Sequence, residues 1–76
     1  MQKLPRLSGK EVIKILLGIG FVSIRQKGSH IFMKKETKDR PVTLVVPNHK
    51  EIDKGTLLEI IRQAKLSKEE FIKKVK

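Results

Sequence analysis

Hydrophobic residues near the start of the chain recur with the period of an α-helix. At 100° per residue, the apolar positions from 12 to 19 fall on one broad arc, opposite Lys10, Lys14 and Gly18. The members of this arc are Val12, Ile13, Ile15, Leu16, Leu17 and Ile19. Ser8 and Glu11 have the S-x-x-E spacing of a capping box, which predicts a helix that begins after Ser8 and ends at Gly18 or Gly20.

After this helix the period of the pattern changes to two, which is typical of β-strands. The predicted strands are Phe21–Arg25, His30–Lys34 and Val42–Val46. In the first of them, Val22 and Ile24 share one face of a half-buried strand, and Ser23 and Arg25 share the other. Pro47 stops the third. The connections at 27–29 and 35–41 are short, so we expect the three strands to pair antiparallel as a meander.

The helical period returns after a polar loop at 48–52. Asp53 is a suitable N-cap for a second helix. Its expected apolar side consists of Leu57, Leu58, Ile60, Ile61 and Ala64, and its polar side of Glu59, Arg62 and Gln63. A second capping box at Ser67 and Glu70 precedes a last short helix that carries Phe71. The order helix, three strands, helix, short helix predicts an α+β two-layer domain with the helices on one face of the sheet.

The charge of the chain points to a polyanionic partner. Its 76 residues suit one domain, and they carry a formal net charge of +10 with no cysteine to form disulfides. Residues 1–35 hold eight Lys and Arg but one acidic residue, Glu11, which favours nucleic acid as the partner over lysine acting only for solubility. No apolar run is long enough for a membrane span, and Lys3, Pro5 and Arg6 do not fit a signal peptide, so we expect a soluble cytoplasmic protein.

The turn between the first two strands is the best candidate for chemistry. Gly28 and Ser29 are turn residues, and His30 follows them at the start of an apolar strand. Such a turn would present the imidazole at the rim of the sheet, with Arg25, Lys27 and Lys34 close enough to gather phosphate.

The alternation of the second strand predicts what lies beside this histidine. If Ile31 and Met33 face the helices, then His30, Phe32 and Lys34 face outward together. An imidazole, an aromatic ring and a cation on an open sheet suit unstacked RNA. This strand is apolar on both faces, so the alternative is that Phe32 belongs to the core.

Several short motifs, taken in order, are similar to those of the HicA toxin family. They are Leu7–Val12, Gly20–Phe21, Arg25–His30, Val46–His49, Lys54–Leu57, Ile61–Ser67 and Glu69–Phe71. The resemblance spans about residues 4 to 72. It implies one HicA-like domain over residues 1–76, with a fold like that of double-stranded-RNA-binding domains.

The same resemblance implies a function. HicA proteins are mRNA interferases of type II toxin–antitoxin systems, which inhibit translation and growth until a HicB-type antitoxin binds them. The catalytic histidine that follows the family's turn corresponds to His30, and the role of His49 stays open. We expect a monomer, or a hetero-oligomer with the antitoxin. The RNA-binding residues we expect are Arg25, Lys27, Ser29, Phe32 and Lys34.

Metal-independent RNA cleavage needs one group to accept the 2′-hydroxyl proton and another to protonate the leaving oxygen. An imidazole suits both steps near neutral pH, and cations suit the charge that develops on the phosphate. The second group beside His30 could be His49, Lys27 or water. Two histidines without cysteine make a poor zinc site, so we expect no metal and no cofactor. The rival interpretations are a non-catalytic RNA-binding domain of the same fold and a module that docks an acidic protein.

Overall fold

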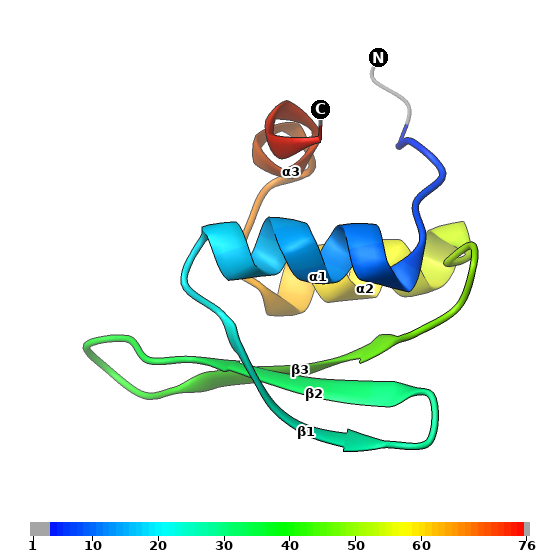
Figure 1. Cartoon of the computed structure of the whole chain (residues 1–76). Helices are drawn as coiled ribbons and strands as arrows, with labels where there is room; N and C mark the ends of the chain where they lie inside the picture. The colour runs from blue at the N-terminus through cyan, green and yellow to red at the C-terminus, as the bar shows by residue number, and fades with distance from the viewer. Residues whose placement is uncertain (1–3, 76) are drawn as a thin grey trace.

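Two helices cross one face of a three-stranded antiparallel sheet, and a third helix packs on their far side (Figure 1). The computed structural model describes residues 4–75. The elements are α1 Gly9–Gly18, β1 Val22–Lys27, β2 His30–Lys35, β3 Val42–Pro47, α2 Lys54–Gln63 and α3 Lys68–Lys74. This order confirms the predicted α+β domain. None of the described helices is long and apolar enough to span a membrane.

Each helix begins at the cap that its sequence predicts. The Ser8 hydroxyl accepts a hydrogen bond from the Glu11 amide at 3.2 Å, and the Glu11 carboxylate accepts one from the Ser8 amide at 2.8 Å. Ser67 and Glu70 repeat this reciprocal pair at the start of α3, with distances of 3.0 and 2.8 Å. The Asp53 carboxylate caps α2 by accepting from the Thr56 amide at 3.1 Å. These bonds satisfy amides that the first turn of a helix leaves without partners.

The caps make the stability of the fold depend on pH in the acid range. Hydrogen bonds from Ser67 hold the pKa of Glu70 below its ordinary value of 4.5, and hydrogen bonds from Thr56 hold that of Asp53 below 3.8. A carboxylate whose pKa is lower in the folded than in the unfolded state stabilises the fold. This stabilisation is complete above the unfolded-state pKa and is lost as the pH falls through the folded-state pKa.

We therefore expect the melting temperature to hold near neutral pH and to fall once the pH drops below about 4.5. Glu70→Gln and Asp53→Asn keep capping groups but cannot titrate, so each variant should show a shallower acid decline. Thermal unfolding followed by circular dichroism from about pH 6 to about pH 3 measures this. Glu69→Gln is the control, since Glu69 makes no hydrogen bond to Ser67 within the described residues. Equal slopes for wild type and Glu70→Gln would contradict the cap assignment.

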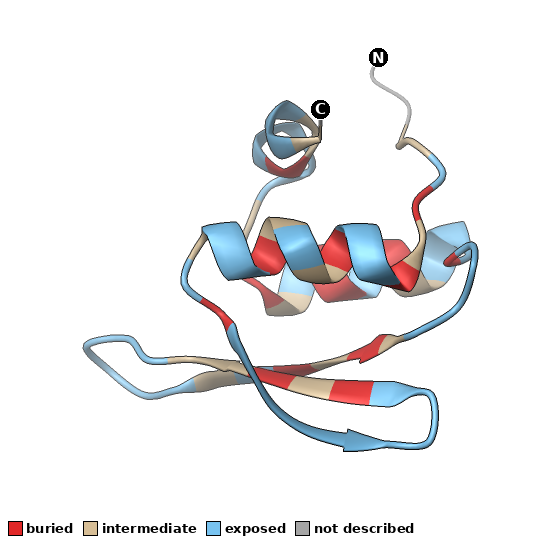
Figure 2. Ribbon diagram, in the orientation of Figure 1, coloured by how far each residue is buried: buried red, intermediate tan, exposed pale blue. Residues whose placement is uncertain are grey.

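One apolar core lies between the helices and the sheet, visible as the red segments that face one another in Figure 2. Its fully buried members are Val12, Leu16, Phe21, Met33, Val46, Leu57, Ile60 and Phe71. Two residues of the predicted apolar arcs lie outside the core: Leu17 is 50% exposed and Leu58 is 39% exposed. Leu17 and Leu58 are covered by neither the sheet nor α3, so the broad apolar arcs overestimated the buried face of α1 and α2.

The first strand differs most from its prediction. It runs from Val22 to Lys27 instead of over Phe21–Arg25, and all of its residues are exposed, so the half-buried strand was wrong. Of the five residues predicted, only Phe21 is buried, and it precedes the strand. In the main packing contacts between elements, α1 and α2 meet β3, whereas β1 meets β2. A period of two identifies a strand, but the position of the helices decides which strand they cover.

A bulge in β1 also changes which of its side chains share a face. The pairing shifts between Ser23 and Arg25, so that Ser23 lies opposite Met33 and Arg25 lies opposite Phe32. Directly paired residues share a face of the sheet, and Met33 is buried under the helices. The prediction that Ser23 and Arg25 lie on the same face was therefore wrong. Arg25 is on the face that carries no helix.

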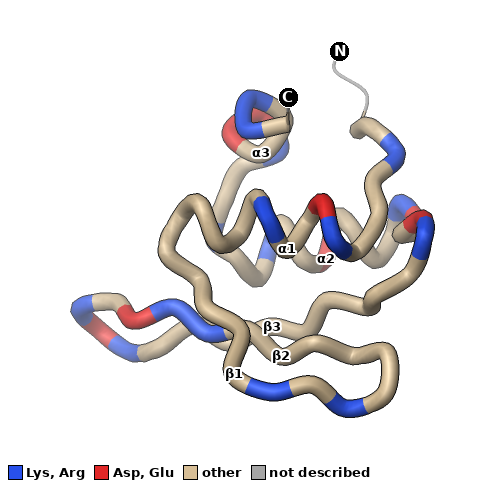
Figure 3. The backbone as a smooth tube through the Cα atoms, viewed as in Figure 1, with Lys and Arg blue, Asp and Glu red and all other residues tan. Residues whose placement is uncertain are grey.

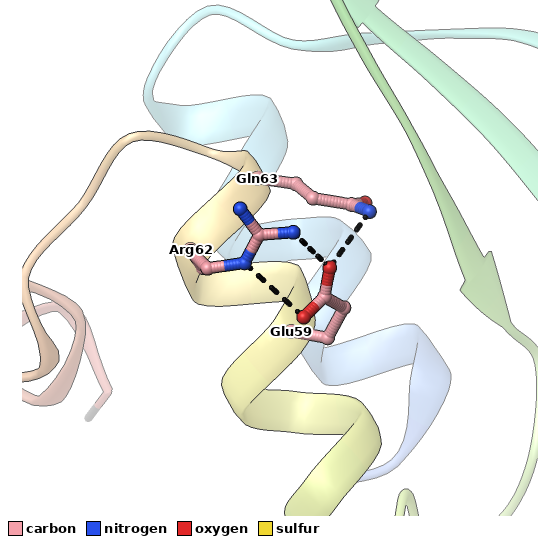
Figure 4. A network of polar contacts seen from close by, with 3 residues as sticks. All are labelled: Glu59, Arg62 and Gln63. Atoms are coloured by element: carbon pink, nitrogen blue, oxygen red, sulfur yellow. Dashed lines mark hydrogen bonds and ion pairs between the residues drawn. The ribbon is translucent and has the colours of Figure 1, made fainter.

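The polar side predicted for α2 is confirmed by a hydrogen-bonded group on its surface (Figure 4). Glu59 accepts hydrogen bonds from Arg62, with which it also forms an ion pair, and from Gln63 at 3.2 Å. The hydrogen bond from Arg62 lowers the pKa of Glu59. This pair engages the Arg62 charge locally, so the free positive charge of the domain lies elsewhere.

Candidate functional site

The candidate site begins at the two-residue turn between β1 and β2. Lys27 and His30 are opposite one another in the pairing, with Gly28 and Ser29 between them. Gly28 has φ +60°, a left-handed backbone conformation that glycine adopts more readily than other residues. A Cβ added to it would meet nothing within 4 Å, so steric crowding is not the reason for glycine here. The Gln26 side-chain amide donates a hydrogen bond to the Gly28 carbonyl at 3.1 Å. His30 is thereby fixed as the exposed first residue of β2.

The predicted alternation of β2 is confirmed. Ile31 and Met33 are buried toward the helices, which places His30, Phe32 and Lys34 on the other face. Phe32 is half-buried on that face and is not part of the core, so the alternative interpretation of this residue was wrong.

The pairing of β1 with β2 adds two cations to the helix-free face. Lys27 lies opposite His30, and Arg25 lies opposite Phe32 with its guanidinium carbon 5.6 Å from the ring centroid. A cation over an aromatic face is a favourable contact, and such a flat pair resembles the platforms on which bases stack. Four of the residues predicted for the site therefore share one face near the turn.

Lys34 does not join them. It lies opposite Val22, near the far end of the β1–β2 hairpin, and its ammonium group forms an ion pair with Glu36 at 3.1 Å. Four residues along a strand correspond to about 13 Å. The expectation that Lys34 gathers phosphate beside His30 does not fit this placement.

The loop that carries the second histidine packs against the turn. The Asn48 amide donates a hydrogen bond to the Ser29 carbonyl at 2.6 Å, and Pro47 is the β3 residue opposite His30. The β1–β2 turn and the loop from β3 to α2 therefore meet at one end of the sheet (Figure 1). His49 is exposed and comes directly after this contact. Its approach to the turn was not predicted, because the two histidines are far apart in the sequence.

Gly9 holds this end of the fold together and was missed in the sequence. Its amide donates a hydrogen bond to the His49 carbonyl at 2.8 Å. A Cβ on Gly9 would lie 2.4 Å from the Pro47 carbonyl oxygen and 2.8 Å from the Asn48 Cα, so only glycine fits here without movement of the backbone. The sequence does carry a sign of this constraint, because Gly9 is the first residue of a helix and glycine is a poor helix former.

The charge around the turn is predominantly positive. Lys10 and Lys50 are exposed next to Gly9 and His49, which a hydrogen bond joins, and Lys27 is exposed directly before the turn. Figure 3 shows Lys and Arg along β1 and near the helix ends on the same side. The nearby acidic groups are engaged: Glu11 by its capping box and Glu51 by Arg6 at 3.8 Å. Exposed cations without acidic partners attract phosphate.

The residues at this end of the sheet suit acid–base chemistry on a phosphate ester. The chain offers an exposed imidazole for proton transfer, cations for phosphate oxygens and an aromatic ring beside a guanidinium for a base. Within residues 4–75, no three His, Asp or Glu side chains gather as a metal site would require.

The chain was compared with known proteins. A family model described as "HicA toxin of bacterial toxin-antitoxin" matches residues 9–66, from the first residue of α1 to the segment after α2. No curated protein matches the chain. The family match covers the turn, both histidines and Gly9, and it leaves out α3.

Proposed function

This chain belongs to the HicA toxin family, and we propose that it is an endoribonuclease that cleaves mRNA with His30 as an acid–base group. The observation that carries the proposal is the position of His30. It is exposed beside a turn of two residues, with Lys27 opposite it on the same face of the sheet. The family implies an antitoxin as partner, and an mRNA substrate would place the activity in the cytoplasm.

In the proposed reaction the ribose 2′-oxygen attacks the adjacent phosphorus and displaces the 5′-oxygen of the next nucleotide. One group accepts the proton of the 2′-hydroxyl, and another donates a proton to the leaving 5′-oxygen. The products are a 2′,3′-cyclic phosphate and a 5′-hydroxyl end, so no water is consumed and no oxidant is needed. Lys27, which is opposite His30, would offset the negative charge that develops on the phosphate oxygens.

His30 takes one of the two proton-transfer roles. Of the candidates for the other, His49 is favoured over water because its loop is hydrogen-bonded to Ser29, the residue before His30. Lys27 is better suited to phosphate binding, since an ammonium group is charged at neutral pH. The Arg25–Phe32 pair would hold a base next to the scissile bond.

The test is cleavage of an end-labelled synthetic RNA by the purified full chain, with the ends of the products identified. We expect 2′,3′-cyclic phosphate ends in the presence of EDTA, because no step requires a metal ion. RNA binding by the wild-type chain without any cleavage would overturn the proposal in favour of a non-catalytic RNA-binding domain. Growth arrest that survives the His30→Ala substitution would also overturn it.

The proposed interface also predicts how RNA affinity responds to salt. Each lysine that neutralises a phosphate of single-stranded RNA contributes about −0.7 to the slope of log K against log salt concentration. Lys27→Ala should weaken binding and make this slope shallower by about that amount. Lys34→Ala is the matched control, because Lys34 is paired with Glu36 away from the turn. The measurement is fluorescence anisotropy with a labelled RNA over a salt series. Equal slopes for the two variants would place the contact elsewhere.

A further inference from the structure

The outer edge of β1 is an open strand edge. In the sheet order β1-β2-β3, β1 pairs with β2 on one side, and no other segment of residues 4–75 pairs with its second side. Figure 2 shows the strand exposed along its whole length. An exposed edge presents unpaired backbone N–H and C=O groups that can accept a further strand.

The other edge of the sheet is less accessible. β3 packs against α2, and a groove there is lined by Thr43 and Val45 together with Thr56, Glu59 and Gln63 of that helix. Glu59 and Gln63 belong to the hydrogen-bonded group of Figure 4. β3 is also an edge strand, but a strand added to it would lie against these side chains of α2, whereas the main contacts of β1 are with β2. We therefore consider β1 as the docking edge.

Exposed apolar side chains occur on β1 and on the last turn of α1 before it. Val22 is 54% exposed, Ile24 is 53% exposed and Leu17, at the end of α1, is 50% exposed. They are three of the four most exposed large apolar side chains in the described part of the chain. RNA contacts are dominated by phosphate and gain little from aliphatic side chains, whereas an added strand covers them. These exposed apolar side chains therefore favour a protein partner over RNA.

The charge of the hairpin selects the kind of protein. Arg25 and Lys27 are exposed on β1, and no acidic residue occurs between positions 12 and 35. A second copy of this chain would bring another basic strand, with no acidic residue, beside Arg25 and Lys27, and like charges repel. A strand with Asp or Glu opposite these cations and apolar residues opposite Val22 and Ile24 would match the edge.

We infer that the antitoxin docks here by adding an acidic extended segment to the free edge of β1. This inference rests on the antitoxin partner that the family implies, and it names the surface of contact. β1 ends at Lys27, directly before the turn and His30. A strand held on this edge therefore ends beside the proposed cleavage site and excludes RNA from it, which links docking to inhibition.

The test uses the full chain with its cognate antitoxin. Hydrogen–deuterium exchange should show amides of residues 22–27 protected in the complex and not in the free chain. The double variant Val22→Lys/Ile24→Lys should lose at least tenfold in antitoxin affinity, measured by isothermal titration calorimetry. Leu58→Lys is the matched control, an exposed apolar residue on α2, and should bind as wild type does. Both variants change exposed residues, so both should fold, and their circular dichroism spectra should match that of the wild type.

Unchanged affinity in the double variant, or protection confined to other elements, would overturn the inference. Protection of the amides of residues 22–24 by a single-stranded oligonucleotide and not by the antitoxin would also overturn it, because the apolar half of the β1 edge would then be an RNA surface. The outcome is separable from the proposed function. If the chain never cleaved RNA but its antitoxin protected the amides of β1, the proposed endoribonuclease activity would be refuted. The inferred docking of the antitoxin on β1 would still be supported.

Discussion

Replacing His30 with alanine is expected to lower the rate of RNA cleavage by about 10²- to 10⁴-fold, because a group that transfers a proton in the transition state is lost. RNA affinity should change little, since the phosphate contacts come from Lys27 and its neighbours. The fold should also persist, because the His30 side chain is exposed and makes no hydrogen bond in the described structure. The measurement is single-turnover cleavage with enzyme in excess, beside binding of the same RNA.

Ser23→Ala is the matched control for this substitution. Ser23 is exposed on the same hairpin, but it lies opposite Met33, at the other end of β1 and on the other face of the sheet. Its cleavage rate should stay within about twofold of wild type. A similar loss of cleavage in both variants would mean that the hairpin as a whole matters and that His30 has no special role. The single substitution His49→Ala should also lower the rate of RNA cleavage, because we propose its imidazole as the second proton-transfer group.

The Gly9→Ala substitution is expected to destabilise the domain by about 1–3 kcal/mol, although it adds a single methyl group. The new Cβ would meet backbone atoms of Pro47 and Asn48, which cannot rotate away as a flexible side chain would. The loop must shift, and that weakens the hydrogen bonds from Gly9 to His49 and from Asn48 to Ser29. Urea unfolding measures the loss of free energy, and faster amide exchange at Gly9 and Asn48 locates it.

Gly18→Ala provides the comparison within the same helix. A Cβ on Gly18 would have nothing within 4 Å, and alanine is the better helix former, so this variant should equal wild type or gain up to about 1 kcal/mol. If Gly9→Ala proved as stable as Gly18→Ala, the close approach of α1 to the loop would not be a constraint on the fold. The same comparison tests the loop contact that brings His49 to the turn.

The sequence was sufficient for features that residues a few positions apart decide. The caps at Ser8, Asp53 and Ser67 depend on hydrogen bonds across three positions, and their spacing can be read directly. The alternation of Ile31 and Met33 with His30 and Phe32 follows from the geometry of a strand, so the outward direction of His30 was predictable. Most of the candidate site lies within this one hairpin.

Only the tertiary structure decided how segments distant in the sequence meet. The bulge at Ile24 turned Arg25 toward Phe32, and the position of the helices over β3 left β1 uncovered. The contact of Asn48 with Ser29 brings the second histidine to the turn. Such outcomes depend on packing between elements, which local spacing does not encode. The sequence thus determined the elements and the histidine at the turn, and the packing determined its neighbours.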